Sequence, residues 1–339
     1  MNLKNFWYIA CESSQLTKEK PLPSELMGEW IALYRDNTGK AVAVTDRCLH
    51  RNARLSKGRV HQGNLACPYH GWRYGKNGEV VAVPSEGEKF QPKASMCLKT
   101  FLTREQDGYV YVQLEKEESL QPKAVPFLGK PGYSHVRLVH IFEAEVPNCA
   151  ENFIDIPHTT FVHPNIFRYQ REPQRLLGEV EMEKGNVHIR YREESSNFGI
   201  FSKFLNKEKK EIFHEDHYYL PNFTHVEYRF VDGKHFNITS QSVPTRNGLT
   251  TVYTDLTYDY GIWNWVAKPF VYITAKMIIG QDVRIMAQQS EVTKHFGEQF
   301  VSTRADLQHI HIERIYKALR EEKDPREFQA KKETVEFWI

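Results

Sequence analysis

The stretch that decides the fold runs from Cys48 to Trp72 and reads CLHRNARLSKGRVHQGNLACPYHGW. It contains two mixed pairs of metal-ligand residues, Cys48 with His50 and Cys67 with His70. Zinc fingers usually keep like ligands together, Cys with Cys and His with His. Here each pair offers one thiol and one imidazole beside residues that favour turns.

These mixed pairs match the ligand demand of a Rieske [2Fe–2S] centre, in which one iron takes two thiolates and the other takes two imidazoles. Two loops that each supply one Cys and one His can each reach over both irons. Pro68 and Gly71 allow a tight second loop, and Gly58 and Gly63 allow the intervening hairpin to turn. The competing interpretation is a zinc knuckle or unrelated Cys and His residues. We therefore expect a [2Fe–2S] cluster held by Cys48, His50, Cys67 and His70.

The residues around this stretch predict a small antiparallel all-β domain. Alternating segments separated by Gly and Asn turns indicate short strands at residues 29–36, 41–46, 79–83 and 108–114. Residues 115–134 are polar and then rich in Pro and Gly, as is typical of a domain boundary. A chain of 339 residues has room for two domains, which we place at residues 1–120 and 121–339.

The second domain is predicted to place strands before helices. A strand at 136–146 and a helix starting near Asn148 precede hairpins that turn at residues 184–186, within 179–194, and at 232–233, within 225–243. A further strand follows at 249–260, and helical periodicity extends from Trp263 to about Arg320. This order predicts the α+β class, with an antiparallel sheet packed on helices.

Composition excludes several function classes. The net charge is +2 with acids and bases intermixed, so no field toward nucleic acid or a membrane surface is indicated. The five cysteines are an odd number that favours ligation in a reducing, cytoplasmic compartment. The most apolar segment, residues 263–280, carries Lys268, Pro269 and Lys276, which favours a buried or amphipathic helix over a transmembrane span.

A second metal site is predicted in ENFIDIPHTTFVHP, residues 151–164. Asp155 and His158 are three residues apart and would share a helix face, whereas His163 would need a widened turn to join His158. Pro157 disturbs the interior of such a helix. Two imidazoles and one carboxylate form the facial triad of non-haem Fe(II) oxygenases, which leaves positions open for O₂.

Taken together, these motifs resemble the Rieske non-haem iron oxygenase family. CLH and CPYHGW are similar to its Rieske loops, and neither loop carries the additional Cys that is usual in respiratory Rieske proteins. The family signature D/E-x3-D-x2-H-x4-H is matched at Glu151, Asp155, His158 and His163. The resemblance implies a second domain of the helix-grip type, an antiparallel sheet around a long helix.

Carried over residue by residue, the resemblance implies His158, His163 and Asp282 as ligands of the mononuclear iron. Asp282 follows from an E/Q-D pair that opens a helix in the family, here within GQDVRIMAQQ. The carboxylates that compete with it are Glu291, Asp255 and Asp259.

The resemblance also gives Asp155 a bridging role. It would link His158 to His70 of a neighbouring subunit, which implies a ring oligomer, expected to be a homotrimer. Glu151 is expected to orient nearby groups rather than bind iron, and Asn152 to line a pocket, support a ligand or cap a helix.

For the remaining His-rich motifs, structural roles are favoured over metal binding. HEDHYY, with His214 and His217 three residues apart, is either a separate metal site or a solvated or edge-strand cluster, and the cluster is favoured. His309 and His311 are two apart in a helical pattern and are expected to be ordinary helix residues. Aromatic residues between Phe213 and Phe230 suit a sheet that lines a hydrophobic cavity, or plain sheet packing.

The function implied by the resemblance is that of a terminal oxygenase with a [2Fe–2S] cluster, Fe(II) and O₂ as co-substrate. No G-x-G-x-x-G or P-loop motif is present, so NAD(P)H would act through a separate reductase or ferredoxin. The substrate would be a small hydrophobic organic molecule. The chain is nearer in length to the family's single-subunit-type monooxygenases and demethylases than to its large ring-dihydroxylating α subunits, so the resemblance favours monooxygenation or demethylation over dihydroxylation. Two alternatives are an electron carrier with a docking domain and a hydrophobic-ligand binding protein with a structural cluster.

Overall fold

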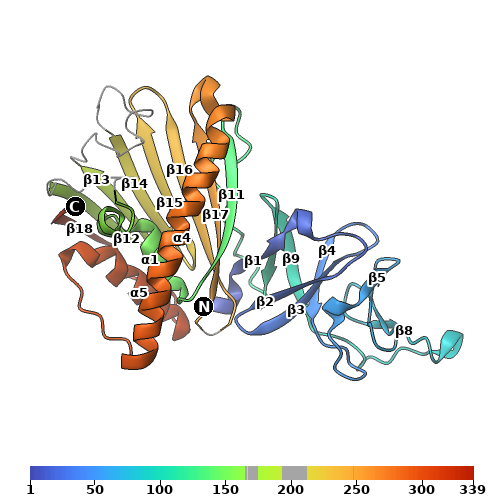
Figure 1. Ribbon diagram of the computed structural model, residues 1–339. Helices are drawn as coiled ribbons and strands as arrows, with labels where there is room; N and C mark the ends of the chain where they lie inside the picture. Colours follow the sequence, from blue (N-terminus) through green and yellow to red (C-terminus); the bar gives the residue numbers. More distant parts are fainter. Residues whose placement is uncertain (165, 167–174, 193–211, 247) are drawn as a thin grey trace. The chain divides into compact units, whose positions relative to one another are not determined.

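The computed structural model describes residues 1–164, 166, 175–192, 212–246 and 248–339, and the chain divides into two compact units (Figure 1). One unit extends from Lys4 to Ala124 and includes Thr245 and Arg246, and the other comprises Met1–Leu3, Val125–Pro244 and Gly248–Ile339. Within the described residues, no helix is both long enough and apolar enough to cross a membrane.

The N-terminal unit is built from two antiparallel sheets, which confirms the predicted all-β domain. The larger has the strand order β1-β10-β9-β4-β3-β2, and the smaller has the order β5-β6-β7-β8. The strands are β1 (Trp7–Glu12), β2 (Leu22–Leu26), β3 (Glu29–Arg35), β4 (Ala41–Thr45), β5 (Arg59–His61), β6 (Asn64–Ala66), β7 (Arg73–Tyr74), β8 (Val80–Ala82), β9 (Thr100–Gln106) and β10 (Tyr109–Gln113).

The core of this unit reaches the two loops that carry the mixed Cys and His pairs. Cys48 and Cys67 are buried in one hydrophobic cluster with Tyr34, Leu65 and Tyr74. Since close-packed interiors hold side chains in defined positions, this packing fixes the two thiols before any metal binds.

The second unit contains one eight-stranded antiparallel sheet, in the order β11-β17-β16-β15-β14-β13-β12-β18. Its strands are β11 (Ser134–Phe142), β12 (Arg175–Glu183), β13 (Asn186–Arg192), β14 (Ile212–Tyr219), β15 (Phe223–Phe230), β16 (His235–Pro244), β17 (Thr250–Asp259) and β18 (Lys331–Trp338). Both predicted hairpins are present, although residues 193 and 194 of the first lie outside the described residues. β18, which pairs with β12, was not predicted.

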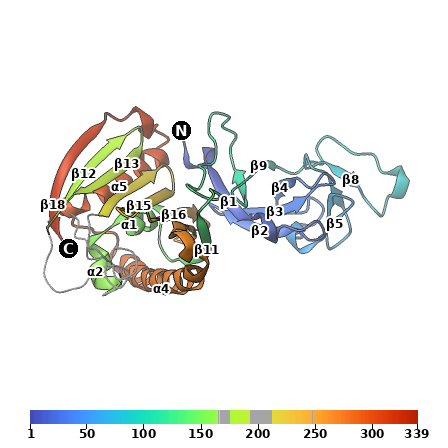
Figure 2. The same cartoon turned by 90° about the horizontal axis from the view of Figure 1, so that it is seen from above.

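In the part of the chain that the structure describes, the α-helices that accompany this sheet are α1 (Val146–Ile154), α2 (Pro157–Val162), α4 (Asn264–Phe296) and α5 (Leu307–Arg320). α4 crosses one face of the sheet (Figure 1), and α2 lies beside α4 in the second view (Figure 2). The predicted helical region is interrupted, because Gly297 adopts a φ of 82° and ends α4 before α5 begins. The predicted α+β class, with an antiparallel sheet packed on helices, is confirmed.

The core of this unit lies between the long helix and the sheet. Val271, Ile279 and Met286 of α4 are buried against Leu138 and Leu256. Their seven- and eight-residue spacing keeps these three side chains on one side of the helix. The helix is therefore held in a fixed position across the strands.

Candidate functional site

The two loops of the N-terminal unit repeat one backbone pattern. Cys48 N donates to Ala53 O and Cys67 N donates to Trp72 O, both at 2.8 Å. The residue four positions after each Cys returns a hydrogen bond to that Cys carbonyl, and it has a positive φ of 55° in Asn52 and 70° in Gly71. Asn and Gly are the residues that adopt this left-handed conformation most readily. The sequence thus builds two matching finger-like loops.

Thiols and imidazoles occupy different depths of these loops. Cys48 and Cys67 are buried, whereas His50 and His70 are exposed, with their ring centroids 4.5 Å apart. Tyr74 places its hydroxyl 3.1 Å from Cys48 Sγ, and a hydrogen bond to a cluster sulfur is one of the contacts that set reduction potential. Two inner thiols and two outer imidazoles are the arrangement that a Rieske cluster requires.

The donor set fits a cluster better than a single ion. Among the residues that the structure describes, two groups of three or more ligand atoms lie within 4.8 Å of one another, and neither contains these four side chains. A tetrahedral zinc site would bring its ligand atoms that close together. Burial, together with the neighbouring Cys48 thiol, raises the pKa of Cys67, so iron would have to displace the thiol proton.

The second predicted site is formed where a helix breaks. α1 ends at Ile154, Asp155 follows as its C-cap in extended conformation, and Pro157 starts α2. The expected continuous helix through Asp155 and His158 is therefore wrong, because Pro157 begins a new helix. His163 leaves the helical conformation at the end of α2, with φ −118° and ψ 57°.

This break brings His158 and His163 to one carboxylate. Asp282 Oδ1 lies 3.6 Å from His158 Nε2 and 3.0 Å from His163 Nε2. His163 and Asp282 are buried, and Asp282 Oδ1 is fully buried without a hydrogen-bond partner. A buried carboxylate oxygen that faces two imidazole nitrogens and accepts no hydrogen bond is the kind of group that a metal ion would satisfy. These residues therefore fit a two-His, one-carboxylate iron site.

The Nδ1 atom of each imidazole, on the far side of the ring from Nε2, contacts a side-chain oxygen. Asp155 Oδ2 lies 3.0 Å from His158 Nδ1 and accepts from the His158 backbone N–H at 3.1 Å. Gln281 Oε1 lies 2.7 Å from His163 Nδ1. Such contacts fix the tautomer and direct Nε2 toward the metal position. Burial disfavours the charged form of His158, but the Asp155 hydrogen bond and the nearby carboxylates outweigh it and raise its pKa.

We expect Gln281→Leu to weaken iron binding by roughly 10–100-fold, the usual cost of losing a group that orients a metal-binding His. Gln288→Leu, on the same helix outside this site, is the matched control and should leave affinity unchanged. Iron affinity would be measured by competition with a chelator. Equal affinities for the two variants would contradict the supporting role of Gln281.

The competing carboxylates lie elsewhere. Asp255 is bound by His135 and Arg137 at 2.6 and 2.7 Å, and neither Asp259 nor Glu291 belongs to a possible metal-binding group within the described residues. Asp282 lies in the middle of α4, although the family pattern placed it where a helix opens.

Beside the His158, His163 and Asp282 group is a cavity of about 110 Å³. Most of its wall is apolar and comes from both helices and strands, including Phe153, Val226, Phe236, Ile238, Leu256 and Ile278. Asn152 also lines it, in agreement with one of the roles considered for this residue. α4 contributes both Asp282 and part of the wall, at Thr274, Ala275 and Ile278.

Glu151 pairs with a His that was expected to be an ordinary helix residue. His309 Nδ1 lies 3.1 Å from Glu151 Oε2, and the Glu151 carboxylate raises the pKa of His309. Both residues line a hollow of about 300 Å³ that also reaches Asp155 and His158. His311 is buried.

The HEDHYY motif falls on β14, an interior strand, so it is not an edge-strand cluster. Successive side chains on a strand point to opposite faces, so His214 and His217 cannot share a site. His214 lines the cavity, whereas His217 faces the outer side of the sheet. The sequence alone could have predicted that His214 and His217 face opposite sides of the sheet, because side chains alternate along a strand.

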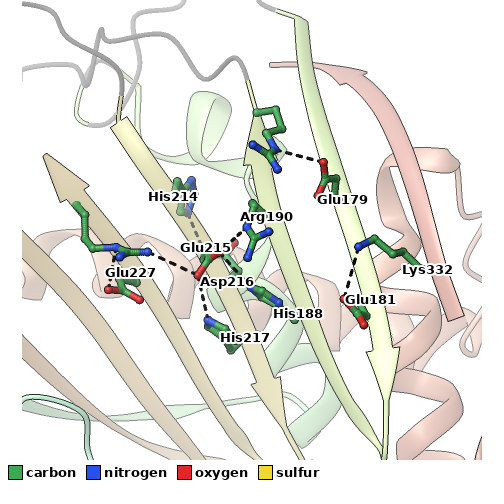
Figure 3. Close-up of polar contacts among 12 residues, drawn as sticks. Glu179, Glu181, His188, Arg190, His214, Glu215, Asp216, His217, Glu227 and Lys332 are labelled. Atoms are coloured by element: carbon green, nitrogen blue, oxygen red, sulfur yellow. Dashed lines mark hydrogen bonds and ion pairs between the residues drawn. The ribbon is translucent and has the colours of Figure 1, made fainter. Parts of the chain in front are cut away.

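On that outer side, His188, Arg190 and His217 gather around Glu215 (Figure 3). The ligand atoms of His188, Glu215 and His217 lie within 4.8 Å of one another. Arg190 Nε, however, donates to Glu215 Oε1 at 2.6 Å and already supplies a positive charge to the carboxylate. An ion-pair network therefore accounts for this group.

The fold and the two sites define a two-domain iron–sulfur protein with a second site for a lone metal ion. The family model for the Rieske [2Fe-2S] domain matches residues 6–102, and the model for the vanillate O-demethylase oxygenase C-terminal domain matches residues 142–322, more than half of the chain. The chain belongs to the Rieske non-haem iron oxygenases that have this C-terminal domain. The cofactors that this family implies are a [2Fe–2S] cluster and Fe(II), with O₂ and with NAD(P)H acting through a reductase.

Curated relatives match over part of their length. The vanillate O-demethylase oxygenase subunit of Pseudomonas sp. (strain HR199 / DSM 7063) is 31% identical over 163 residues, which cover 47% of this chain and 45% of the relative. The toluene-4-sulfonate monooxygenase system iron-sulfur subunit TsaM1 of Comamonas testosteroni is 29% identical over 173 residues, 48% of this chain and 47% of the relative. The alignments thus span about half of the curated relatives.

Solved structures share the fold over nearly the whole chain. NdmA of Pseudomonas putida CBB5, as a QL mutant with theobromine, has a TM-score of 0.79 at 20% identity and covers 96% of this chain and 93% of its own. Dicamba monooxygenase bound to dicamba has a TM-score of 0.78 at 20% identity and covers 94% of this chain and 97% of its own.

Proposed function

We propose that this protein is the terminal oxygenase of a Rieske-type system, which hydroxylates or demethylates a small hydrophobic organic substrate. The observation that carries the proposal is the orphaned Oδ1 of Asp282 facing His158 and His163 beside an apolar cavity. When bound, the [2Fe–2S] cluster supplies single electrons and Fe(II) supplies the activation of O₂.

The remaining steps belong to the chain itself. Cys48, His50, Cys67 and His70 would hold the cluster, with the two imidazoles exposed toward a redox partner. His158, His163 and Asp282 would hold the lone iron on one side only. The apolar wall of the cavity would exclude water and place the substrate beside that iron.

Asp155 would join the two centres across subunits of a homotrimer. Its carboxylate holds His158 Nδ1 and is partly exposed in the hollow shared with Glu151 and His309. A second acceptor oxygen on this carboxylate could bind the exposed imidazole of His70 from a neighbouring subunit. A separate reductase or ferredoxin would deliver the electrons from NAD(P)H.

Monooxygenation or demethylation is favoured over dihydroxylation. The C-terminal family model is that of vanillate O-demethylase, and the relatives include a monooxygenase subunit. The decisive experiment supplies the purified protein with NADH and a surrogate reductase and follows O₂ uptake and formaldehyde release across methoxyarenes, with 3-methoxybenzoate among them. O₂ uptake that no substrate stimulates, with all three irons present, would refute the proposal.

We expect Asp155→Asn to keep both metal centres and to lower turnover by about 100-fold or more, because an amide has only one acceptor oxygen and its NH₂ group cannot accept from the second imidazole. Iron content, visible absorbance and single-turnover rate would be measured together. The matched control is Asp259→Asn, a change of the same kind in the same unit outside both predicted sites. A normal single-turnover rate in Asp155→Asn would contradict the bridging role proposed for Asp155.

A further inference from the structure

His214 and Asp216 form a buried polar pair in the cavity wall. Both residues are 1% exposed, and His214 Nε2 lies 2.9 Å from Asp216 Oδ1. They stand two positions apart on β14, so both point from the same face of the sheet into the cavity. Burying such groups is costly unless they are paired, and most of their neighbours in this wall are apolar.

The pair is separate from the candidate metal ligands. His158 and Asp282 lie on α2 and α4 and His163 directly follows α2, whereas His214 and Asp216 come from the sheet, and all five line the same cavity. Neither His214 nor Asp216 belongs to a possible metal-binding group within the described part of the chain. The pair therefore offers a second polar contact within reach of a molecule bound beside the metal position.

Aromatic rings on both neighbouring strands hold the His214 imidazole in place. The ring of Tyr228, on β15, stacks on it with centroids 4.1 Å apart. The centroid of the Tyr191 ring, on β13, lies 4.6 Å from that of His214. The carboxylate of Asp216 accepts from Nε2–H and so sets the tautomer of the ring. A buried imidazole whose orientation is fixed in this way is suited to form a hydrogen bond with one polar group of a ligand.

The cavity volume limits what else the ligand can carry. At about 110 Å³ it is comparable with the roughly 150 Å³ apolar cavity that takes up benzene in an engineered protein. The volume therefore limits the part of the ligand held within it to about a single ring, whose other contacts would be with apolar side chains.

We propose that His214, positioned by Asp216, is the residue that orients the substrate, and that the substrate is a single-ring molecule bearing one oxygen group that hydrogen-bonds to this imidazole. This inference rests on the proposed function, because it takes the cavity beside the metal position as the substrate site. Because Nε2–H is donated to Asp216, the other ring nitrogen, Nδ1, is a hydrogen-bond acceptor, so the oxygen group must be a donor such as a phenol hydroxyl. Without this contact a ring could enter in several orientations, so the bond would select which carbon faces the iron.

The test measures binding in the oxidised holoprotein, without turnover. Calorimetric titrations use three probes: 3-methoxyphenol, 3-methoxybenzoate and methoxybenzene, the last lacking the second oxygen group. We expect 3-methoxyphenol to bind roughly tenfold more tightly than methoxybenzene, as one hydrogen bond in a buried site provides. The carboxylate of 3-methoxybenzoate cannot donate to Nδ1, so a preference for this probe instead would contradict the assigned hydrogen bond.

Two variants locate the preference. His214→Phe keeps an aromatic ring between the tyrosines and should reduce the ratio to within about twofold, whereas His214→Gln should restore part of it. His225→Phe, the same substitution at a buried His of β15 that does not line the cavity, is the matched control and should keep the wild-type ratio. Circular dichroism checks that each variant is folded.

Three further results would overturn the inference: equal binding of all three probes to the wild type, a preference that survives in folded His214→Phe, or no detectable binding of any probe. Because no turnover is involved, these outcomes are independent of whether the protein activates O₂. Failure of the proposed function would instead show as absent substrate-stimulated O₂ uptake with the probe preference intact.

Discussion

Asp282→Ala is expected to lose about one iron in three and to lower turnover by more than about 100-fold, while the visible absorbance of the cluster stays unchanged. Asp282 supplies the carboxylate oxygen closest to the two imidazole nitrogens, and that oxygen is buried without a hydrogen-bond partner. Removing it leaves two neutral ligands, which bind Fe(II) far more weakly than two imidazoles and a carboxylate.

Three measurements check this result: iron per chain, the absorbance spectrum and substrate-stimulated O₂ uptake. Glu291→Ala is the matched control, because Glu291 is an exposed carboxylate on the same helix. Loss of the cluster absorbance in Asp282→Ala, or a full iron complement with normal turnover, would show that the lone iron is not held here.

Cys67→Ser is expected to remove the visible absorbance and both cluster irons, and to reduce NAD(P)H-driven turnover to background. Cys67 is buried in the hydrophobic core of its unit, on a loop whose backbone bonds direct it toward Cys48. A serine hydroxyl ionises far less readily than a thiol and is a poor ligand for this iron.

The lone iron should remain in Cys67→Ser, since its three candidate ligands belong to the other compact unit. Cys97→Ser serves as the control, because Cys97 is an exposed thiol in the same unit as Cys67. Iron analysis should therefore give about one iron per chain for Cys67→Ser and about three for Cys97→Ser. A spectrum unchanged in Cys67→Ser would overturn the assignment of the cluster ligands.

Local patterns in the sequence were sufficient to predict much of the fold. Period-two alternation predicted the hairpins, because each strand and its partner are neighbours along the chain. β18 was missed because its partner β12 is far away in the sequence, and its segment KKETVEFW is largely charged and exposed. Gly297 was not recognised as the end of a helix, although its left-handed conformation is the usual signal.

The candidate sites show the same division between local and distant information. His158 and His163 could be singled out from one short motif, but Asp282 required a family resemblance, because contacts such as His163 to Gln281 join residues 118 positions apart. No local pattern predicts such a contact. The pair of cavity-facing residues on β14 could have been predicted from the sequence, since strand alternation alone places His214 and Asp216 on the same face.

The long helix α4 has a consequence for how new specificities can arise in this protein. Asp282 and Gln281 belong to the proposed metal site, while Thr274, Ala275 and Ile278 of the two preceding turns line the cavity proposed for the substrate. Exchanges at those three positions can reshape the chamber while the reactive centre stays intact. Directed evolution toward unfamiliar compounds would therefore do well to randomise this short segment first.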